Sequence, residues 1–252
     1  MNKPIVCITG ATSGFGLAMA RRFASEGYRV ILTGRRTDRL TRAAEELRNA
    51  GAECLPLSFD VRNRADVEKA FASIPSDWLP VDVLINNAGL AVGRETIEEG
   101  DPDDWDRMID TNVKGLLWVS RMFIPGMKTA RKGTIINIGS IAGREGYPGG
   151  NVYSATKFAV DALNRSMRID LLPFGIRVGQ IAPGAAETEF SLVRFKGDQV
   201  RANAVYEGFE PLHPEDIADA AWYMASRPPH VCIQDMLIMP TAQAGASHLY
   251  KK

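Results

Sequence analysis

Tyr153 and Lys157 are the residues in this sequence whose types and spacing most directly suggest chemistry. Residues four apart on a helix share a face, so a phenol and an ammonium group would lie side by side. A free tyrosine titrates near ~10 and is a poor acid or base at neutral pH. A neighbouring cation stabilises the phenolate and lowers that pKa toward the range where proton transfer is efficient. The pair therefore predicts a general acid–base site within residues 140–157.

A glycine-rich stretch lies near the start of the chain, between an apolar run at 4–9 and a helical pattern at 17–26. A strand, a glycine loop and a helix together can bring backbone amides to a pyrophosphate. The spacing Gly-x-x-x-Gly-x-Gly departs from the common Gly-x-Gly-x-x-Gly pattern, and many glycine-rich turns bind nothing, but this placement favours a dinucleotide site. The loop residues expected at the cofactor are Gly10, Thr12, Ser13, Gly14, Phe15 and Gly16.

Two arginines, Arg35 and Arg36, follow the second predicted strand, at the position where such a fold meets the adenosine ribose. An acidic residue there would accept a hydrogen bond from a free 2′-hydroxyl. Arginine forks instead suit a phosphate, so the pair predicts a preference for NADP(H) over NAD(H). The alternative, a solvated helix start, is less favoured because the glycine loop lies upstream.

Apolar runs of strand length alternate with stretches of helical spacing along the whole chain, which predicts one α/β domain with a parallel sheet covered on both faces. No repeat or linker divides residues 1–252. Residues 185–210 fit the alternation least well, and are interpreted as a mobile lid over the site or as an ordinary surface insertion. The expected strands are 4–9, 28–33, 53–59, 81–85, 134–138, 176–181 and 236–239, and the expected helices are 17–26, 38–49, 63–74, 102–127, the helix of Tyr153, and 214–226.

Composition excludes several classes of function. The thirty basic and thirty acidic residues cancel without forming a basic stripe, so nucleic acid is not an expected partner. Cys7, Cys54 and Cys232 are far apart, which predicts reduced thiols in a cytoplasmic protein, with no disulfide and no metal site. No segment has the length of a membrane span. The three histidines lie in the last fifth of the chain, so a histidine-dependent nucleophile is not expected.

Taken in order, the motifs resemble the short-chain dehydrogenase/reductase family from about residue 3 to residue 240. The resemblance implies a Rossmann fold of seven parallel strands. It further implies that Asp60 and Val61 contact the adenine and that the Asn86 region borders the cofactor. The matching pieces are residues 9–16, Asp60-Val61, Asn86-Asn87-Ala88-Gly89, Asn112, Ser140, Tyr153-x-x-x-Lys157, and Pro183-Gly184 through Thr188, which would line the nicotinamide.

The same resemblance, together with the chemistry, suggests roles for four residues. Tyr153 would donate a proton to a carbonyl oxygen during reduction and act as the base during oxidation. Ser140 would hydrogen-bond the same oxygen, where negative charge develops. Lys157 would lower the pKa of the tyrosine and bind the nicotinamide ribose, and Asn112 would hold a water that links Lys157 to solvent. Taken alone, Ser140 and Asn112 would each be interpreted as ordinary structural residues.

A narrower resemblance is to bacterial NADP-dependent 3-hydroxy acid dehydrogenases, which act on serine, allo-threonine and small 3-hydroxy acids, and to the related sulfoacetaldehyde reductases. It rests on stretches such as 33–36, 60–64, 149–153, 188–190 and 193–197. Both substrate classes are short anions, so the site needs a cation away from the carbonyl. The candidates are Arg144 and Arg194. Arg144 and the 185–187 segment depart from the hydroxy-acid pattern, which keeps a sulfonate substrate open.

Two further alternatives follow from the sequence. The chain could be an NADP-sensing module without turnover, because Rossmann folds can bind cofactors without catalysis, although such modules need not keep all four catalytic groups. The Tyr153 helix is apolar on more than one face. The family resemblance implies that this helix and the 102–127 helix pack against copies in a homotetramer, while burial within one chain explains the pattern equally well.

Overall fold

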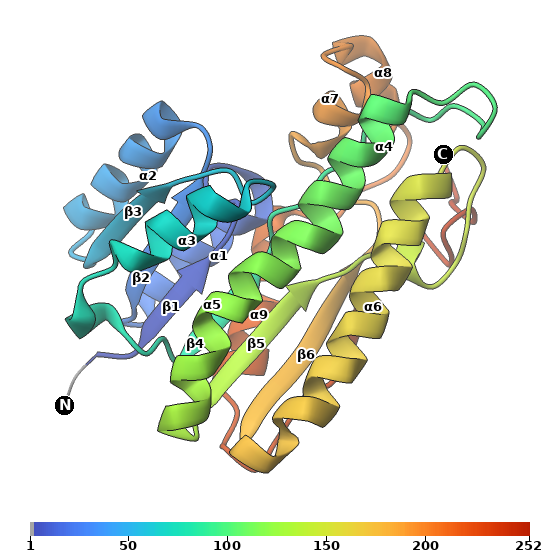
Figure 1. Cartoon of the computed structure of the whole chain (residues 1–252). Helices are drawn as coiled ribbons and strands as arrows, with labels where there is room; N and C mark the ends of the chain where they lie inside the picture. Colours follow the sequence, from blue (N-terminus) through green and yellow to red (C-terminus); the bar gives the residue numbers. More distant parts are fainter. Residues whose placement is uncertain (1–2) are drawn as a thin grey trace.

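A seven-stranded parallel sheet organises the protein, as a computed structural model describes it for residues 3–252 (Figure 1). The strand order is β3-β2-β1-β4-β5-β6-β7, so the chain starts in the middle of the sheet and builds outward in both directions. This doubly wound arrangement confirms the predicted single α/β Rossmann architecture. The strands are β1 (Ile5–Ile8), β2 (Arg29–Gly34), β3 (Cys54–Ser58), β4 (Val83–Asn86), β5 (Gly133–Ile138), β6 (Ile176–Pro183) and β7 (Asp235–Ile238).

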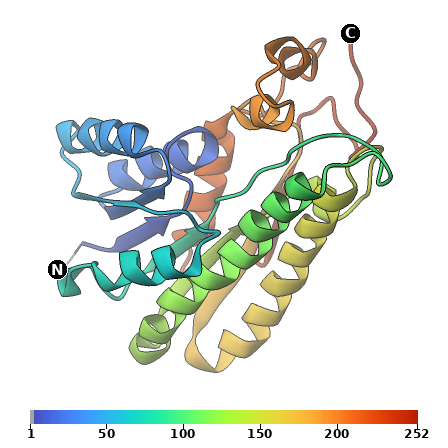
Figure 2. The same ribbon diagram turned by 45° about the horizontal axis from the view of Figure 1, so that its top comes forward.

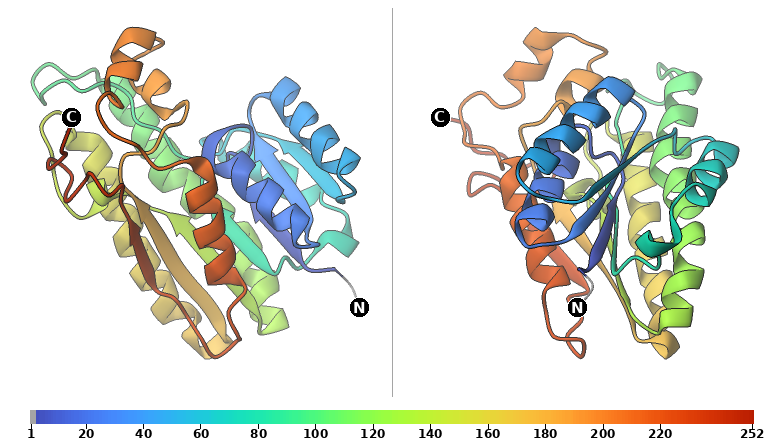
Figure 3. Two further views of the ribbon diagram at one scale, coloured as in Figure 1. Left: turned by 180° about the vertical axis from the view of Figure 1, so that it is seen from behind. Right: turned by 90° about the vertical axis from the view of Figure 1, so that its left-hand side faces the viewer.

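Helices cover both faces of the sheet, as the alternating pattern predicts (Figures 1 and 3). One face carries α1 (Gly14–Ser25), α2 (Thr37–Asn49) and α9 (Pro214–Ala225), and α1 packs against α9. The other face carries α3 (Arg64–Ala72), α4 (Pro102–Ile109), α5 (Gly115–Ala130) and α6 (Asn151–Leu171). Short 3-10 turns lie at Ser76–Trp78, Ile141–Gly143 and Leu172–Phe174.

The sheet separates two hydrophobic cores because successive side chains of a strand point to opposite faces. Ile85 and Ile136 contribute to the core beneath α1 and α9. Leu84 and Ile135, their neighbours along the strands, contribute to the core beneath α5. All four side chains are fully buried, which explains why these strands appear in the sequence as continuous apolar runs.

The predicted helix at 102–127 is interrupted, and this is the main difference in element boundaries. A π-helical turn at Asp110–Lys114 separates α4 from α5. Single π-turns inside helices are rare and often mark functional sites. Asn112 occupies this turn, and its side chain bonds to the Leu90 backbone, a contact that helical periodicity cannot reveal.

The segment 185–210 lies over the edge at which the parallel strands end (Figures 1 and 2). It contains two short helices, α7 (Phe190–Arg194) and α8 (Gln199–Ala204), which the sequence pattern does not predict. Among residues 3–252 no helix is long and apolar enough to cross a membrane. The three cysteines are not paired with one another.

Candidate functional site

One large cavity opens at the carboxyl ends of the strands, and residues of the segment 185–210 line part of it. Its volume is about 1290 Å³, enough for a dinucleotide together with a small second molecule. None of the three histidines lines it. The predicted site residues that do line it are Gly10, Thr12, Ser13, Gly14, Phe15, Arg35, Arg36, Val61, Asn87, Ala88, Gly89, Ser140, Tyr153, Lys157, Pro183, Gly184, Thr188 and Arg194.

The glycine loop is fastened to the end of β4. The Thr9 hydroxyl accepts hydrogen bonds from the backbone amides of Asn87 and Ala88, each at 2.9 Å, and the Asn87 side chain donates to the Thr9 carbonyl at 2.8 Å. Gly10 has φ of 67°, and a Cβ there would lie 3.0 Å from the Ala88 Cα. Glycine is therefore required by both conformation and close approach.

Gly16 and Asp60 support the cavity without lining it. A Cβ on Gly16 would collide with the carbonyl oxygen of Gly10, so Gly16 lets α1 pack tightly under the loop. The Asp60 carboxylate accepts hydrogen bonds from the Arg62 side chain and backbone. Partial burial raises the pKa of Asp60, but these hydrogen bonds outweigh it and hold the pKa below its ordinary value. Asp60 thus shapes the turn that presents Val61 to the cavity.

The two arginines after β2 have different surroundings. Arg35 lies near Asp60, with 3.5 Å between the closest charged atoms. Arg36 reaches over the glycine loop, where it donates to the hydroxyls of Thr12 at 3.1 Å and Ser13 at 2.8 Å. A second nitrogen of Arg36 donates to Glu189 of the segment 185–210 at 2.9 Å. This combination of an arginine fork and two hydroxyls suits a phosphate.

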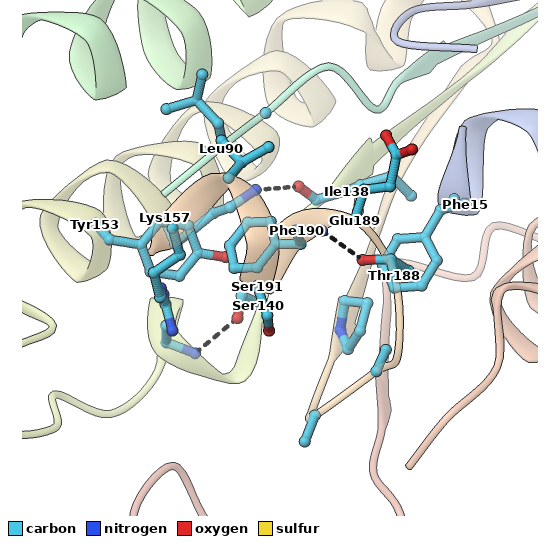
Figure 4. A pocket seen from close by; sticks show the side chains of 18 of the residues that line it. Phe15, Leu90, Ile138, Ser140, Tyr153, Lys157, Thr188, Glu189, Phe190 and Ser191 are labelled. Carbon is cyan, nitrogen blue, oxygen red and sulfur yellow. Dashed lines mark hydrogen bonds between the residues drawn. The ribbon is translucent and has the colours of Figure 1, made fainter. Parts of the chain in front are cut away.

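A second group of residues meets beside the end of β5, where Tyr153 and Lys157 of α6 face Ser140 (Figure 4). The turn that carries Ser140 packs closely on α6, because a Cβ on Gly143 would lie 2.6 Å from the Lys157 carbonyl oxygen. The Ser140 oxygen accepts a hydrogen bond from the Ala142 amide at 3.1 Å. Its own O–H therefore remains free to donate.

Asn112 is buried behind these residues and does not line the cavity. Its side-chain oxygen accepts from the Leu90 amide at 2.8 Å, and its amide nitrogen donates to the Leu90 carbonyl at 2.8 Å and to Thr156 at 3.0 Å. Asn112 thereby ties the chain after β4 to α6. Its expected role in holding a water beside Lys157 stays a prediction.

Burial, rather than Lys157, dominates the titration of Tyr153. Burial raises the pKa of Tyr153 to about 12, and the neighbouring Arg194 and Ser140 lower it only in part. Lys157 is not among the groups that lower the pKa of Tyr153 in the structure, so the expected lowering by Lys157 stays a prediction. The Lys157 ammonium instead donates to the Ile138 carbonyl at 2.8 Å and lies 5.9 Å from the centre of the Tyr153 ring. Tyr153 is therefore a protonated acid at neutral pH.

Lys157 provides a test of this electrostatic environment. Burial lowers the pKa of its ammonium from 10.5 to about 8. Between these values the unfolded chain holds more protons than the folded chain, so Lys157 makes stability rise with pH. From pH ~8 to ~10 this contribution amounts to about 2 kcal/mol. We expect Lys157→Met to remove that rise in denaturant unfolding measured across this range; equal slopes for both proteins would contradict it.

Arg194 lies over the ring of Tyr153. Its guanidinium carbon is 5.1 Å from the centre of the Tyr153 ring and 5.1 Å from that of Phe190. One nitrogen donates to the Tyr147 hydroxyl at 2.7 Å, while Nε is buried and has no hydrogen-bond partner. Arg194 therefore has a buried N–H without a hydrogen-bond acceptor, next to the phenol of Tyr153. An anion could supply that acceptor.

Arg144, the other candidate for binding the substrate anion, lies outside the cavity, and the structure corrects this choice. Its guanidinium pairs with Asp235 and lies 3.8 Å from Asp161. These carboxylates come from β7 and α6, far along the chain from Arg144. Because Asp235 and Asp161 already neutralise Arg144, and Arg144 does not line the cavity, we do not assign it to the substrate anion.

The cavity fits a phosphate-bearing dinucleotide. The glycine loop leaves room for close backbone approach, and the first turn of α1 carries no acidic residue to oppose a phosphate. The sequence profile of the short chain dehydrogenase family matches residues 4–198. This chain belongs to that family. The parallel sheet and the cavity at its carboxyl edge are thus those of a short-chain dehydrogenase.

Close relatives within the short-chain dehydrogenase family cover nearly the whole chain. NADP-dependent 3-hydroxy acid dehydrogenase YdfG of Salmonella typhi is 49% identical over 96% of this chain and 97% of its own length. The sulfoacetaldehyde reductase of Chromohalobacter salexigens is 46% identical over 95% of this chain and 94% of its own. The solved closed form of serine dehydrogenase complexed with NADP+ is 45% identical, with a TM-score of 0.93 over 98% of this chain and 99% of that one.

Sequence reasoning missed several residues at the site. Tyr147 and Phe190 surround Arg194, and Glu189 and Arg39 form ion pairs at the far end of the cavity. Tyr147 lies between Ser140 and Tyr153, and an aromatic residue at that position could have been predicted to lie near the site. The ion pairs of Glu189 join residues about 150 positions apart, which no local pattern reveals.

Proposed function

We propose that this protein is an NADP(H)-dependent oxidoreductase that interconverts a carbonyl and an alcohol on a short anionic substrate of the 3-hydroxy acid type. The observation that carries the proposal is the meeting of Tyr153, Ser140 and Arg194 in one cavity with the phosphate-binding loop. The relatives named above support both the cofactor and the substrate class.

The residues divide the work between the two ends of the cavity. Arg35, Arg36, Thr12 and Ser13 would hold the 2′-phosphate, and Gly10 and Gly14 would let the loop approach the pyrophosphate. Lys157 would bind the nicotinamide ribose. Bound NADPH would supply the hydride that reaches the carbonyl carbon.

Proton transfer belongs to the chain itself. Tyr153 donates its phenolic proton to the carbonyl oxygen in reduction and recovers it from solvent afterwards. Ser140 donates its free O–H to the same oxygen, where negative charge develops. Buried Tyr153 holds its proton at neutral pH, which matches the role of acid.

An anionic substrate suits the charge of the cavity. Among the described residues, its lining includes a single acidic side chain, Glu189. Such a surface attracts anions and raises their local concentration. The eight basic residues that line it are Arg35, Arg36, Arg94, Arg107, Lys157, Arg194, Arg201 and Lys251.

Sulfoacetaldehyde reduction to isethionate is the second candidate, because Arg194 can bind a sulfonate as well as a carboxylate. The Chromohalobacter salexigens relative supports it. The presence of Arg144, which departs from the hydroxy-acid pattern, does not support a sulfonate substrate, because Arg144 lies outside the cavity. A steady-state panel decides between the two, with NADPH and sulfoacetaldehyde, malonic semialdehyde or succinic semialdehyde, and with NADP+ and serine, 3-hydroxypropionate or isethionate. The highest kcat/KM identifies the substrate class.

Arg194→Ala tests the anion site. We expect it to raise KM for anionic aldehydes about 10- to 100-fold, the effect of losing a charged hydrogen bond, and to leave KM for a neutral aldehyde of similar size within about twofold. Arg144→Ala is the matched control and should change neither KM. Equal changes for charged and neutral aldehydes in Arg194→Ala would remove the basis for an anion site.

Assembly as a cytoplasmic homotetramer remains part of the proposal. Phe158, Ile169 and Leu172, in and just beyond α6, are exposed, and Leu172 has 73% of its surface accessible. Exposed apolar side chains on the helix that the family resemblance assigns to an interface are consistent with packing against a copy. Light scattering of the purified protein measures the oligomeric state.

A further inference from the structure

A single carboxylate stands out in a cavity that otherwise suits anions. Glu189 is the only acidic residue among the described residues that line the cavity, against eight basic ones. A dinucleotide carries several negative charges, and the proposed substrate carries another. An acidic side chain in this place repels both the dinucleotide and the substrate, so its presence needs an explanation.

Glu189 occupies the end of the cavity assigned to the adenosine phosphate. One carboxylate oxygen accepts from Arg36 at 2.9 Å and the other accepts from Arg39 at 2.5 Å. The same Arg36 donates to Thr12 and Ser13 of the glycine loop. Partial burial raises the pKa of Glu189, but the two arginines outweigh it and hold the pKa below its ordinary value, so the group is a carboxylate at neutral pH.

We propose that Glu189 is a built-in counter-anion for the 2′-phosphate site, which weakens binding of the 2′-phosphate and thereby limits the preference for NADP(H) over NAD(H). The inference rests on the proposed use of NADP(H). The 2′-phosphate competes with Glu189 for Arg36 and Arg39, because a dianionic phosphate and a carboxylate cannot both take the same donors without strong repulsion. A cofactor without this phosphate cannot displace Glu189.

The position of Glu189 in the chain links this exchange to the catalytic end. Glu189 immediately precedes α7, which begins with Phe190 and ends with Arg194. The Phe190 ring packs edge-on against Tyr153, with 5.5 Å between ring centres. Release of Glu189 from Arg36 and Arg39 therefore frees the start of α7. This helix carries Phe190, which contacts Tyr153, and Arg194, the proposed anion-binding residue. The 2′-phosphate would act on the lid as well as on affinity.

Glu189→Gln tests the competition, because glutamine keeps the size of the side chain and removes its charge. Calorimetry would compare 2′,5′-ADP with 5′-ADP, two nucleotides that differ in the 2′-phosphate. We expect the variant to bind 2′,5′-ADP about tenfold more tightly than the unaltered protein, within the range of couplings between sites, and to bind 5′-ADP unchanged. Glu187→Gln, at an exposed position in the same segment that does not line the cavity, should match the unaltered protein.

Hydrogen exchange gives a second readout that does not depend on turnover. In the unaltered protein, 2′,5′-ADP should speed amide exchange at residues 188–194, and 5′-ADP should not. Glu189→Gln should show the faster exchange without any nucleotide. If Glu189→Gln binds 2′,5′-ADP more weakly, or if its affinity rises equally for both nucleotides, the inference is overturned. The proposed use of NADP(H) is unaffected by either result. Failure of the unaltered protein to bind NADPH overturns both.

Discussion

Tyr153→Phe is expected to lower kcat for carbonyl reduction about 10²- to 10⁴-fold, the usual contribution of a positioned general acid. The substitution removes only the hydroxyl. The remaining ring can keep its edge-on contact with Phe190. NADPH affinity, measured by nicotinamide fluorescence, should stay within about twofold, because Tyr153 acts on the substrate oxygen.

Tyr147→Phe is the matched control for this prediction. It removes the other phenol beside Arg194, together with its hydrogen bond to the Arg194 guanidinium. Because Tyr147 orients the anion-binding group and does not supply the proton, the control should raise KM for anionic substrates and change kcat much less. If Tyr153→Phe keeps more than about a tenth of the original kcat, Tyr153 is not the proton donor.

Lys157→Met is expected to have the second largest effect, with kcat lower by about 10²- to 10³-fold, as when one electrostatic stabiliser of a reacting group is removed. Burial raises the pKa of Tyr153 to about 12, so the phenolate formed during reduction needs a nearby cation. Lys157 is the ammonium group on the same face of α6, one helical turn away.

Stability and activity should separate in this variant. Methionine removes the free-energy cost of burying a charge. This gain in stability offsets the loss of the hydrogen bond to the Ile138 carbonyl. Unfolding midpoints near neutral pH should therefore stay close to those of the unaltered protein while turnover collapses. Activity of Lys157→Met within tenfold of the original would show that the ammonium is not needed for proton transfer.

Local patterns were sufficient to predict the frame of the protein. The β-branched and apolar runs form the strands, and the glycine loop enters α1 as expected, because backbone preferences act between near neighbours. The four-residue spacing of Tyr153 and Lys157 was also sufficient, since both lie on one face of α6 and both line the cavity.

Long-range pairing accounts for what the sequence could not reveal. The sequence suggests that Arg144 is a cation free to bind the substrate, but in the fold Asp235 of β7 pairs with it. The sequence assigns no role to Glu189, and only the fold brings it to Arg36 and Arg39. The direction of the Tyr153 pKa depended on complete burial and on where Lys157 points, and both are properties of the assembled structure.

The most direct test of the proposed reaction follows deuterium from the cofactor. NADPH labelled at nicotinamide C4, prepared in each of its two stereochemical forms, would be mixed with the purified protein and a short anionic aldehyde, and the alcohol analysed by mass spectrometry. We predict one deuterium on the former carbonyl carbon from one labelled form only, and a rate of deuterium transfer lower by about 10²- to 10⁴-fold with Tyr153→Phe. Saturable NADPH binding without deuterium transfer to any carbonyl tested would contradict it and identify a cofactor-binding module.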